Sequence, residues 1–314
     1  MSKDRFLVTG GAGFIGSNLV EELLKRGHDV AVFDNFSTGR RVNLRTFAKD
    51  IELLEGDLRD ANAVRAAVHG RTFVLHQGAL PSVTRSVQDP IASNDVNVGG
   101  TLNVLLAARD AGVKKVVAAS SSSVYGDTPT LPKIESMPVL PMSPYAVSKL
   151  ATEKYCAAFY RVYGLETVAL RYFNVFGPRQ DPTSQYSAVI PRFITAVLNG
   201  QHPVIYGDGL QSRDFTFVAN VVDANIRACY ADGVAGEFFN VACGERYTLM
   251  DLLITVGEIT GKPAKATHEP GRTGDVRHSL ADISKIQKAM AFEPRVKFRQ
   301  GLEATVAFFS QELS

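Results

Sequence analysis

The feature that most constrains this chain is a glycine-rich turn close to its N-terminus. Residues 9–16, TGGAGFIG, lie between the apolar segment 6–8 and a stretch with leucines at 19, 23 and 24, which fall on one helix face. Glycines at 10, 13 and 16 permit a tight turn, close approach of the backbone to a pyrophosphate, and close packing of helix on strand. The pattern predicts a strand–turn–helix unit that binds a dinucleotide through its phosphates at the helix N-terminus.

Acidic residues after the next two expected strands identify the dinucleotide. Asp34 ends the second strand, where a carboxylate can bind both hydroxyls of the adenosine ribose. Asp57 follows the third strand and is placed to reach the adenine. Because Asp34 would repel a 2′-phosphate, NAD is favoured over NADP, although Arg40 and Arg41 leave NADP open as an alternative.

Short apolar runs alternate with longer amphipathic stretches through the first half of the chain. Strands that are apolar throughout and separated by helices indicate a parallel sheet covered on both faces. The predicted fold class is α/β, a doubly wound parallel Rossmann sheet with a smaller C-terminal substrate-binding lobe. The expected strands are 6–8, 29–33, 51–54, 72–75, 115–118 and 166–170, with long helices around 97–111 and 145–163.

The domain organisation follows from a change of rhythm after about residue 171, where Gly and Pro punctuate shorter elements. We expect residues 1–172 to form the NAD-binding domain, completed by about 214–241. Residues 173–314 should be mainly substrate-binding lobe. No linker rich in Gly, Ser or Pro separates the halves, so the chain is expected to cross between lobes more than once.

Composition excludes several classes of function. The net charge is +2, and no Lys/Arg run is long enough to mark a nucleic-acid binder. No apolar stretch approaches the roughly 18–20 residues of a membrane span. Three cysteines far apart in sequence suit a reducing cytosol, and the six histidines lack metal-ligand spacing. We therefore expect a cytoplasmic protein without metal, membrane or nucleic-acid partner.

A tyrosine and a lysine at i and i+4, Tyr145 and Lys149, share one face of the expected helix. A cation about 5 Å from a phenol, at an effective dielectric near 20, favours the phenolate by roughly 3 kcal/mol, or about two pKa units. The pair can then act as a general base beside NAD, although an ordinary surface pair is favoured on the spacing alone. Serines 120–123 follow the fifth strand, at the carboxyl edge where such sheets place their chemistry. They can relay a proton or merely cap the strand.

Taken together, these motifs resemble the extended short-chain dehydrogenase/reductase family, and within it the nucleotide-sugar 4-epimerases that act on UDP-glucose and UDP-N-acetylglucosamine. The resemblance spans nearly the whole length. It rests on the glycine pattern, the serine run before VYG at 124–126, the Tyr-xxx-Lys pair, and the segments HQGA (76–79), NVGGT (97–101), RYFNVFGP (171–178), GDGLQSRDF (207–215) and RTGD (272–275).

The resemblance implies a role for each of these residues. Tyr145 is the base, Lys149 lowers its pKa and binds the nicotinamide ribose, and Ser121 is the relay hydroxyl, with Ser122 a near rival. The implied cofactor residues are Gly10, Gly13, Phe14, Ile15, Gly16, Asp34, Asn35, Ser37, Thr38, Gly39, Asp57, Leu58, Gln77, Ala79, Asn97, Ser120, Tyr145, Lys149 and Tyr172. The implied substrate residues are Ser82, Ser121, Ser122, Tyr145, Asn174, Val189, Tyr206, Arg213, Arg272, Asp275 and Ser279.

Comparison within the family selects the chemistry. Dehydrating members carry an Asp-Glu pair directly after the active-site hydroxyl residue, where this chain has Ser122 and Ser123. Decarboxylating members place an acidic residue in the same loop, also absent here. The expectation is reversible redox at carbon 4 of a UDP-sugar, with NAD kept bound. A net dehydrogenase or reductase that consumes NAD(H), and a non-catalytic NAD-sensing regulator, are the alternatives.

The resemblance also bears on the sugar and on assembly. Four residues after the implied ribose-binding Asp275, family members restricted to glucose and galactose have a Tyr, and this chain has Ser279. We expect UDP-GlcNAc/UDP-GalNAc interconversion alongside UDP-Glc/UDP-Gal, with a UDP-uronic acid as the alternative. A homodimer is expected through helices 90–111 and 144–163. The candidate contacts, each of which can equally face its own sheet, are Val104, Leu105, Ala108 and Phe159.

Overall fold

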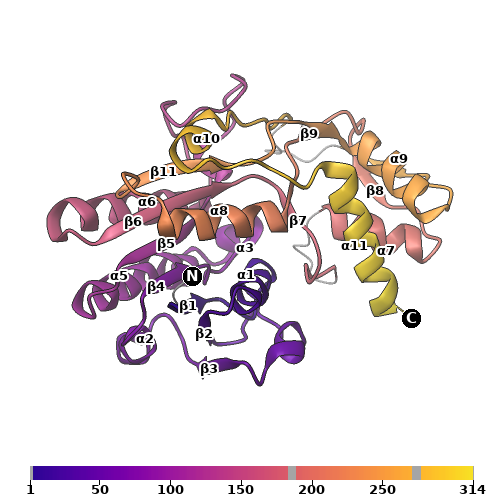
Figure 1. Ribbon diagram of the computed structural model, residues 1–314. Helices are drawn as coiled ribbons and strands as arrows, with labels where there is room; N and C mark the ends of the chain where they lie inside the picture. Colours follow the sequence, from indigo (N-terminus) through magenta and orange to yellow (C-terminus); the bar gives the residue numbers. More distant parts are fainter. Residues whose placement is uncertain (1–2, 183–188, 271–276, 314) are drawn as a thin grey trace.

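A seven-stranded parallel sheet forms the centre of the computed structural model, which describes residues 3–182, 189–270 and 277–313. The strand order is β11-β6-β5-β4-β1-β2-β3, so the chain winds outward in both directions from β1 (Figure 1). Every predicted strand is present, and the doubly wound prediction is confirmed. The bounds are β1 Arg5–Thr9, β2 Asp29–Asp34, β3 Ile51–Glu55, β4 Phe73–His76, β5 Lys115–Ser121, β6 Glu166–Tyr172 and β11 Glu237–Val241.

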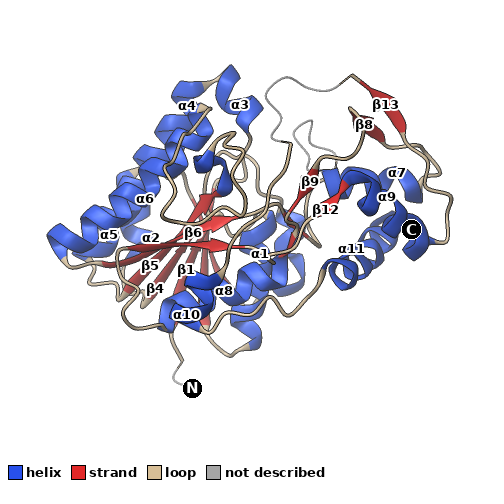
Figure 2. Ribbon diagram, turned by 90° about the horizontal axis from the view of Figure 1, so that it is seen from above, coloured by secondary structure: helices blue, strands red, loops and turns tan. Residues whose placement is uncertain are grey.

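Helices cover both faces of this sheet (Figure 2). On one face lie α2 (Ala61–Val68), α5 (Gly100–Asp110) and α6 (Pro144–Tyr163); on the other lie α1 (Phe14–Lys25) and α8 (Val218–Tyr230), with α10 (Ser284–Met290) against α8 and β11. Alternate strand residues serve the two faces: Phe73 and Leu75 of β4 join one apolar cluster, and Val74 joins the other. This double burial explains why the strands are apolar throughout.

The strand β3 is the exception to that pattern. It lies at the edge of the sheet beyond β2, and Leu53 is 41% exposed. Its charged residues face solvent and form ion pairs, Glu52 with Arg71 at 2.7 Å and Glu55 with Arg41 at 2.6 Å. The prediction of an apolar, doubly covered strand is therefore wrong for β3.

The two long helices differ in regularity. The helix predicted at 97–111 is α4 (Pro90–Asn94) and α5 joined by a π-helical turn, η2 (Asp95–Gly99), and α3 (Val83–Gln88) precedes them. By contrast, α6 is continuous. The Ser143 side chain caps its N-terminus by accepting from the Ala146 N–H at 3.1 Å, and Gly164 ends it in the left-handed conformation.

Several elements from the second half of the chain surround an aromatic cluster. Phe176, Phe215 and Phe298 pack there edge-on or stacked, with centroids 5.5–6.3 Å apart. Among the described residues, no helix is long and apolar enough to cross a membrane. The helices here are α7 (Val189–Leu198), α9 (Leu249–Thr260) and α11 (Phe298–Leu313). The strands form three pairs: β7 (Val175–Phe176) with β10 (Thr216–Phe217), β8 (Val204–Tyr206) with β13 (Thr267–Glu269), and β9 (Ser212–Arg213) with β12 (Tyr247–Thr248). Two short helices, η1 (Arg41–Phe47) and η3 (Ser122–Tyr125), belong instead to the half of the chain that forms the central sheet.

The glycine turn fixes how closely α1 approaches β1. Gly10 has a φ of +66°, and a Cβ on Gly16 would lie 2.1 Å from the Gly10 carbonyl oxygen. By contrast, Gly99 has helical backbone angles, and nothing lies within 4 Å of a Cβ built there. Gly16 and Gly99 thus both have helical backbone angles, but only Gly99 has space for a side chain.

We expect Gly16→Ala to lower the free energy of unfolding by about 1–3 kcal/mol or more, because the backbone must move to admit the methyl group. Gly99→Ala should be neutral or stabilising by up to about 1 kcal/mol, since it restricts the unfolded chain without a clash. Urea denaturation of both variants measures this. Equal losses in the two variants would contradict the packing explanation.

Candidate active site

A cavity of about 730 Å³ runs from the glycine turn to the first turns of α6, along the carboxyl edge of the sheet. Its walls bring together residues that are far apart in the sequence, as the parallel sheet requires. The predicted cofactor residues that line it are Gly10, Gly13, Phe14, Ile15, Gly16, Asp34, Asn35, Ser37, Thr38, Gly39, Asp57, Leu58, Gln77, Ala79, Ser120, Tyr145, Lys149 and Tyr172.

The acidic end of this cavity is organised around Asp34. Its carboxylate accepts from the Ala12 N–H at 2.9 Å and from the Phe36 N–H at 2.8 Å, while burial raises its pKa. A Cβ on Gly39 would lie 2.8–2.9 Å from the Asp34 oxygens, so only glycine leaves this wall open. The buried carboxylate fits the adenosine ribose of NAD, and the glycine turn beside it fits the pyrophosphate. Of the two arginines that kept NADP open, Arg41 is paired with Glu55, and Arg40 lines the cavity.

The opposite end holds the expected proton-transfer residues. The Lys149 ammonium donates to the Ala119 carbonyl at 2.9 Å and lies 5.9 Å from the centre of the Tyr145 ring. The side chain of Ser121 is hydrogen-bonded to that of Tyr145 and also accepts from the Ser123 N–H at 3.2 Å. The Ser120 hydroxyl is instead directed to Glu153. Among the serines, Ser121 is the one joined to Tyr145, which supports it over Ser122 as the relay.

Burial dominates the protonation of this pair. It raises the pKa of Tyr145, against a smaller lowering by the Ser121 hydrogen bond, and it lowers the pKa of Lys149 to about 8. In the chain alone the pKa of Tyr145 therefore lies above its ordinary value, and the lowering expected from Lys149 beside NAD stays a prediction. The two shifts arise because desolvation disfavours both charged forms, which the i, i+4 spacing does not reveal.

Asn97 does not line the cavity. It is buried in η2, where its Oδ1 accepts from the Leu80 N–H at 2.7 Å and its Nδ2 donates to the Ser148 hydroxyl at 3.0 Å. Leu80 itself lines the cavity. Asn97 thus supports the cavity wall at Leu80 and links it to α6; its contact with the cofactor stays a prediction.

Gln77 and Tyr172 meet on the cavity wall and share a partner that sequence reasoning missed. The Tyr172 hydroxyl donates to Gln77 Oε1 at 3.1 Å and lies 2.8 Å from Asn225 Nδ2. Asn225 also accepts from Gln77 Nε2 at 3.1 Å. Asn225 lies on α8, 53 residues after Tyr172, in a segment without a recognisable motif, so no local signal identified it.

A second cavity, of about 540 Å³, is lined in part by residues 174–176 and 182, whereas residues 179–181 of the same segment line the first. Four of the predicted substrate residues line it: Asn174, Val189, Tyr206 and Arg213.

The other predicted substrate residues lie elsewhere. Ser82 lines the first cavity, and Ser122 begins η3 directly after Ser121. The Ser279 hydroxyl is 3.5 Å from Asn174 Nδ2. Arg272 and Asp275 lie outside the described residues.

Both cavities also have lining residues that the sequence did not single out. In the first, these include Asn43, whose Nδ2 donates to the Ala12 carbonyl at 2.9 Å, and Arg85, on the helix that begins at Ser82. In the second, they include Phe176 and Arg192. A buried carboxylate, Asp214, anchors the neighbouring loops by accepting from the N–H groups of Cys243, Gly244 and Ala281 at 2.9–3.2 Å. Burial raises its pKa to about 6.

Comparison with known proteins agrees with this geometry. The model of the NAD-dependent epimerase/dehydratase family matches residues 6–242. A UDP-glucose 4-epimerase from Mycolicibacterium smegmatis is 40% identical over 97% of this chain and 98% of its own length. A UDP-N-acetylglucosamine 4-epimerase from Methanobrevibacter ruminantium, solved with UDP-N-acetylmuramic acid, superposes with a TM-score of 0.95 at 41% identity over 99% of this chain and all of that one. Thermus thermophilus UDP-glucose 4-epimerase, solved with NAD, gives 0.89 at 40% identity over 98% and 99%.

The chain therefore belongs to the NAD-dependent epimerase/dehydratase family. These relatives are named as UDP-sugar 4-epimerases, one of them is solved with NAD, and the family model is that of NAD-dependent enzymes, which confirms the predicted family, cofactor and class of enzyme. Relatives named for glucose, N-acetylglucosamine and glucuronate all match along nearly the full chain, so the family alone does not select the sugar.

Proposed function

We propose that this protein interconverts UDP-GlcNAc with UDP-GalNAc, and UDP-Glc with UDP-Gal, by reversible oxidation at carbon 4 of the sugar. The observation that carries the proposal is the placement of Tyr145 and Lys149, one turn apart on α6, in the cavity that also contains the glycine turn. Ser121, whose side chain is hydrogen-bonded to that of Tyr145, directly follows the cavity residue Ser120. This arrangement supplies a base, a relay hydroxyl and a cation beside a dinucleotide site.

In this proposal the Tyr145 phenolate accepts the proton of the sugar 4-hydroxyl, directly or through Ser121, and returns it in the reverse step. Lys149 is oriented by its bond to the Ala119 carbonyl and favours the phenolate form. When bound, NAD supplies the reversible hydride acceptance that the chain's own side chains cannot provide. Gly10, Asp34 and Tyr172 are among the residues that would hold it.

The nucleotide end of the substrate is assigned to the second cavity. There Asn174 is fixed by donating to the Asp214 carbonyl at 3.1 Å, and Arg213 can pair with the diphosphate. Arg272 and Asp275 remain part of this proposal through the family resemblance. Anchoring only the nucleotide leaves the 4-keto sugar free to turn, so that either face can receive hydrogen.

The proposed lobes follow from these two cavities. We assign residues 1–172 and about 214–241 to the NAD-binding lobe, and the remainder of 173–314 mainly to the substrate lobe. In support, α8 packs against α1, and β11 pairs with β6 in the central sheet. The chain thus returns to the first lobe after the segment that carries Asn174.

A UDP-uronic acid is the second candidate substrate. Arg85 lines the same cavity as Tyr145, and a guanidinium binds a carboxylate well. The test is to incubate the purified protein, with no cofactor added, with UDP-GlcNAc, UDP-Glc and UDP-glucuronate separately and to measure each 4-epimer. We expect product from the first two. Product from UDP-glucuronate alone would favour the second candidate, and a requirement for stoichiometric added NAD would indicate a net dehydrogenase.

Tyr145→Phe should reduce turnover by about 10²–10⁴-fold, because it removes the proton-transfer group and keeps the ring. Substrate affinity and bound NAD should be retained, and the melting temperature should change little. Steady-state kinetics with a binding titration separates these effects. A variant that retains more than half of the wild-type rate would remove Tyr145 from the mechanism.

Ser279→Tyr should selectively depress activity on UDP-GlcNAc, because a phenol ring fills the space beside Asn174 that an acetamido group requires. Overlap in a close-packed site costs about 1–3 kcal/mol, or roughly 5–150-fold in relative specificity. Ser279→Ala, which adds no bulk, is the matched control. Parallel losses on UDP-GlcNAc and UDP-Glc would show that Ser279 does not face the 2-substituent.

We also propose a homodimer through the outer faces of α3, α4, α5 and α6. Val104, Leu105, Ala108 and Phe159, the candidate contacts, are buried against this chain's own sheet, which is the alternative that the sequence left open for each of them. The outer faces instead expose other apolar side chains. They are Val87, Ile91, Leu106, Val147 and Val162, between 39% and 73% exposed, which is characteristic of an interaction surface.

Light scattering should give a mass near twice the 34.0 kDa of one chain at micromolar concentration. Val147→Asp should shift it toward the monomer, because a carboxylate would be buried at the contact. Ile254→Asp is the control: Ile254 is equally exposed, 54% against 52%, but lies on α9 in the other lobe. A monomeric wild type would rule the dimer out.

A further inference from the structure

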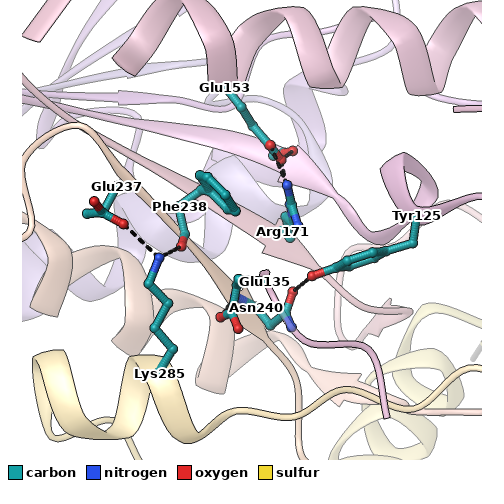
Figure 3. Close-up of polar contacts among 9 residues, drawn as sticks. Tyr125, Glu135, Glu153, Arg171, Glu237, Phe238, Asn240 and Lys285 are labelled. Atoms are coloured by element: carbon teal, nitrogen blue, oxygen red, sulfur yellow. Dashed lines mark hydrogen bonds and ion pairs between the residues drawn. The ribbon is translucent and has the colours of Figure 1, made fainter. Parts of the chain in front are cut away.

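A buried ion pair lies one turn beyond Lys149 along α6, next to the proposed proton-transfer residues. Glu153 of α6 and Arg171 of β6 are each 1% exposed and form two hydrogen bonds of 2.7 Å, from Arg171 Nε to Oε1 and from Nη2 to Oε2 (Figure 3). The Ser120 hydroxyl of β5 donates to the same Oε1 at 2.5 Å. One carboxylate therefore joins a helix to the ends of two strands.

Each of these three residues adjoins a residue of the proposed active site. Ser120 precedes Ser121, and Arg171 precedes Tyr172; these pairs lie opposite each other in the β5–β6 register. Glu153 lies one turn after Lys149 and two turns after Tyr145 on α6. One carboxylate thus links the helix that carries Tyr145 to the strand that carries the relay serine.

The guanidinium of Arg171 is held on both sides by aromatic rings. Its central carbon lies 4.7 Å from the centre of the Tyr125 ring and 4.2 Å from that of Phe238. Tyr125 in turn donates to Asn240 at 2.7 Å, as Figure 3 shows. A buried ion pair is a poor source of stability, because desolvation offsets the attraction. The value of this pair is better explained by the geometry it imposes.

We propose that Glu153 is a positioning residue, which holds Ser120 and hence Ser121 in register with Tyr145 for proton transfer. The inference rests on the proposed function, because it assigns the relay to Ser121. It adds a residue outside the cavity walls, since Glu153 acts through its neighbours and touches neither substrate nor cofactor.

The chain provides a matched control at the other end of the same two strands. Lys115 of β5 and Glu166 of β6 also form an ion pair, at 3.1 Å, with Lys115 2% exposed. Lys115 lies opposite Glu166 at the start of the strands, as Ser120 lies opposite Arg171 near their carboxyl ends. Glu166→Gln therefore weakens a pair between the same strands far from the serines.

The test compares Glu153→Gln with Glu166→Gln in the full-length protein. We expect Glu153→Gln to lower kcat by about 10–100-fold, the effect of misplacing a reacting group by about 1 Å, with KM and bound NAD within about threefold of the wild type. Glu166→Gln should leave kcat within about twofold. In a Ser121→Ala background, the effect of Glu153→Gln should shrink to less than about threefold, because its target is gone. An equal kcat loss in both backgrounds would overturn the proposal.

If the unpaired Arg171 charge prevents Glu153→Gln from folding, the double variant Glu153→Gln/Arg171→Gln removes both charges. It then takes the place of Glu153→Gln in the comparison with and without Ser121→Ala. A wild type inactive on every UDP-sugar would refute the proposed function instead. A second readout then needs no substrate: the Tyr145 phenol, titrated as the ultraviolet difference from the Tyr145→Phe counterpart. Its pKa should rise in Glu153→Gln as the Ser121 hydrogen bond is lost, and an unchanged pKa would overturn the positioning role.

Discussion

Parallel pairing of β5 with β6, and the packing of α6 against both, is the constraint on which the rest of the site depends. Because all seven strands run the same way, their carboxyl ends meet at one edge. The glycine turn after β1, Asp34 at the end of β2, and Ser121 at the end of β5 therefore border one cavity or its immediate surroundings. The loop between β6 and β7 then leads directly to Asn174 and the second cavity.

Burial accounts for the main electrostatic property of this edge. Tyr145 and Lys149 share a helix face, as their spacing predicts, but removal from water disfavours the charged form of each. The chain alone therefore holds a neutral tyrosine beside a lysine whose pKa is lowered to about 8. In the proposed mechanism, the positive charge of bound NAD would favour the Tyr145 phenolate.

Local patterns made much of this fold predictable. Short apolar runs gave the strands, the glycine spacing gave the turn, and the i, i+4 spacing gave the shared face of Tyr145 and Lys149. What these patterns misjudged or left undecided lies where distant segments meet. The exposure of β3 depends on its place at the sheet edge, the inward orientation of Val104 and Phe159 depends on which helix face meets the sheet, and Asn97 is turned inward by Leu80 and Ser148. Glu153 and Arg171 meet across strands, which no motif reports.

The most direct test of the central claim uses a UDP-sugar labelled with deuterium at carbon 4 and no added cofactor. The account predicts that the 4-epimer forms and keeps its deuterium at carbon 4, because oxidation and reduction take place at that carbon within one closed site. Mass spectrometry and proton NMR of the product give the answer. A product that has exchanged its deuterium for hydrogen from water would contradict the account.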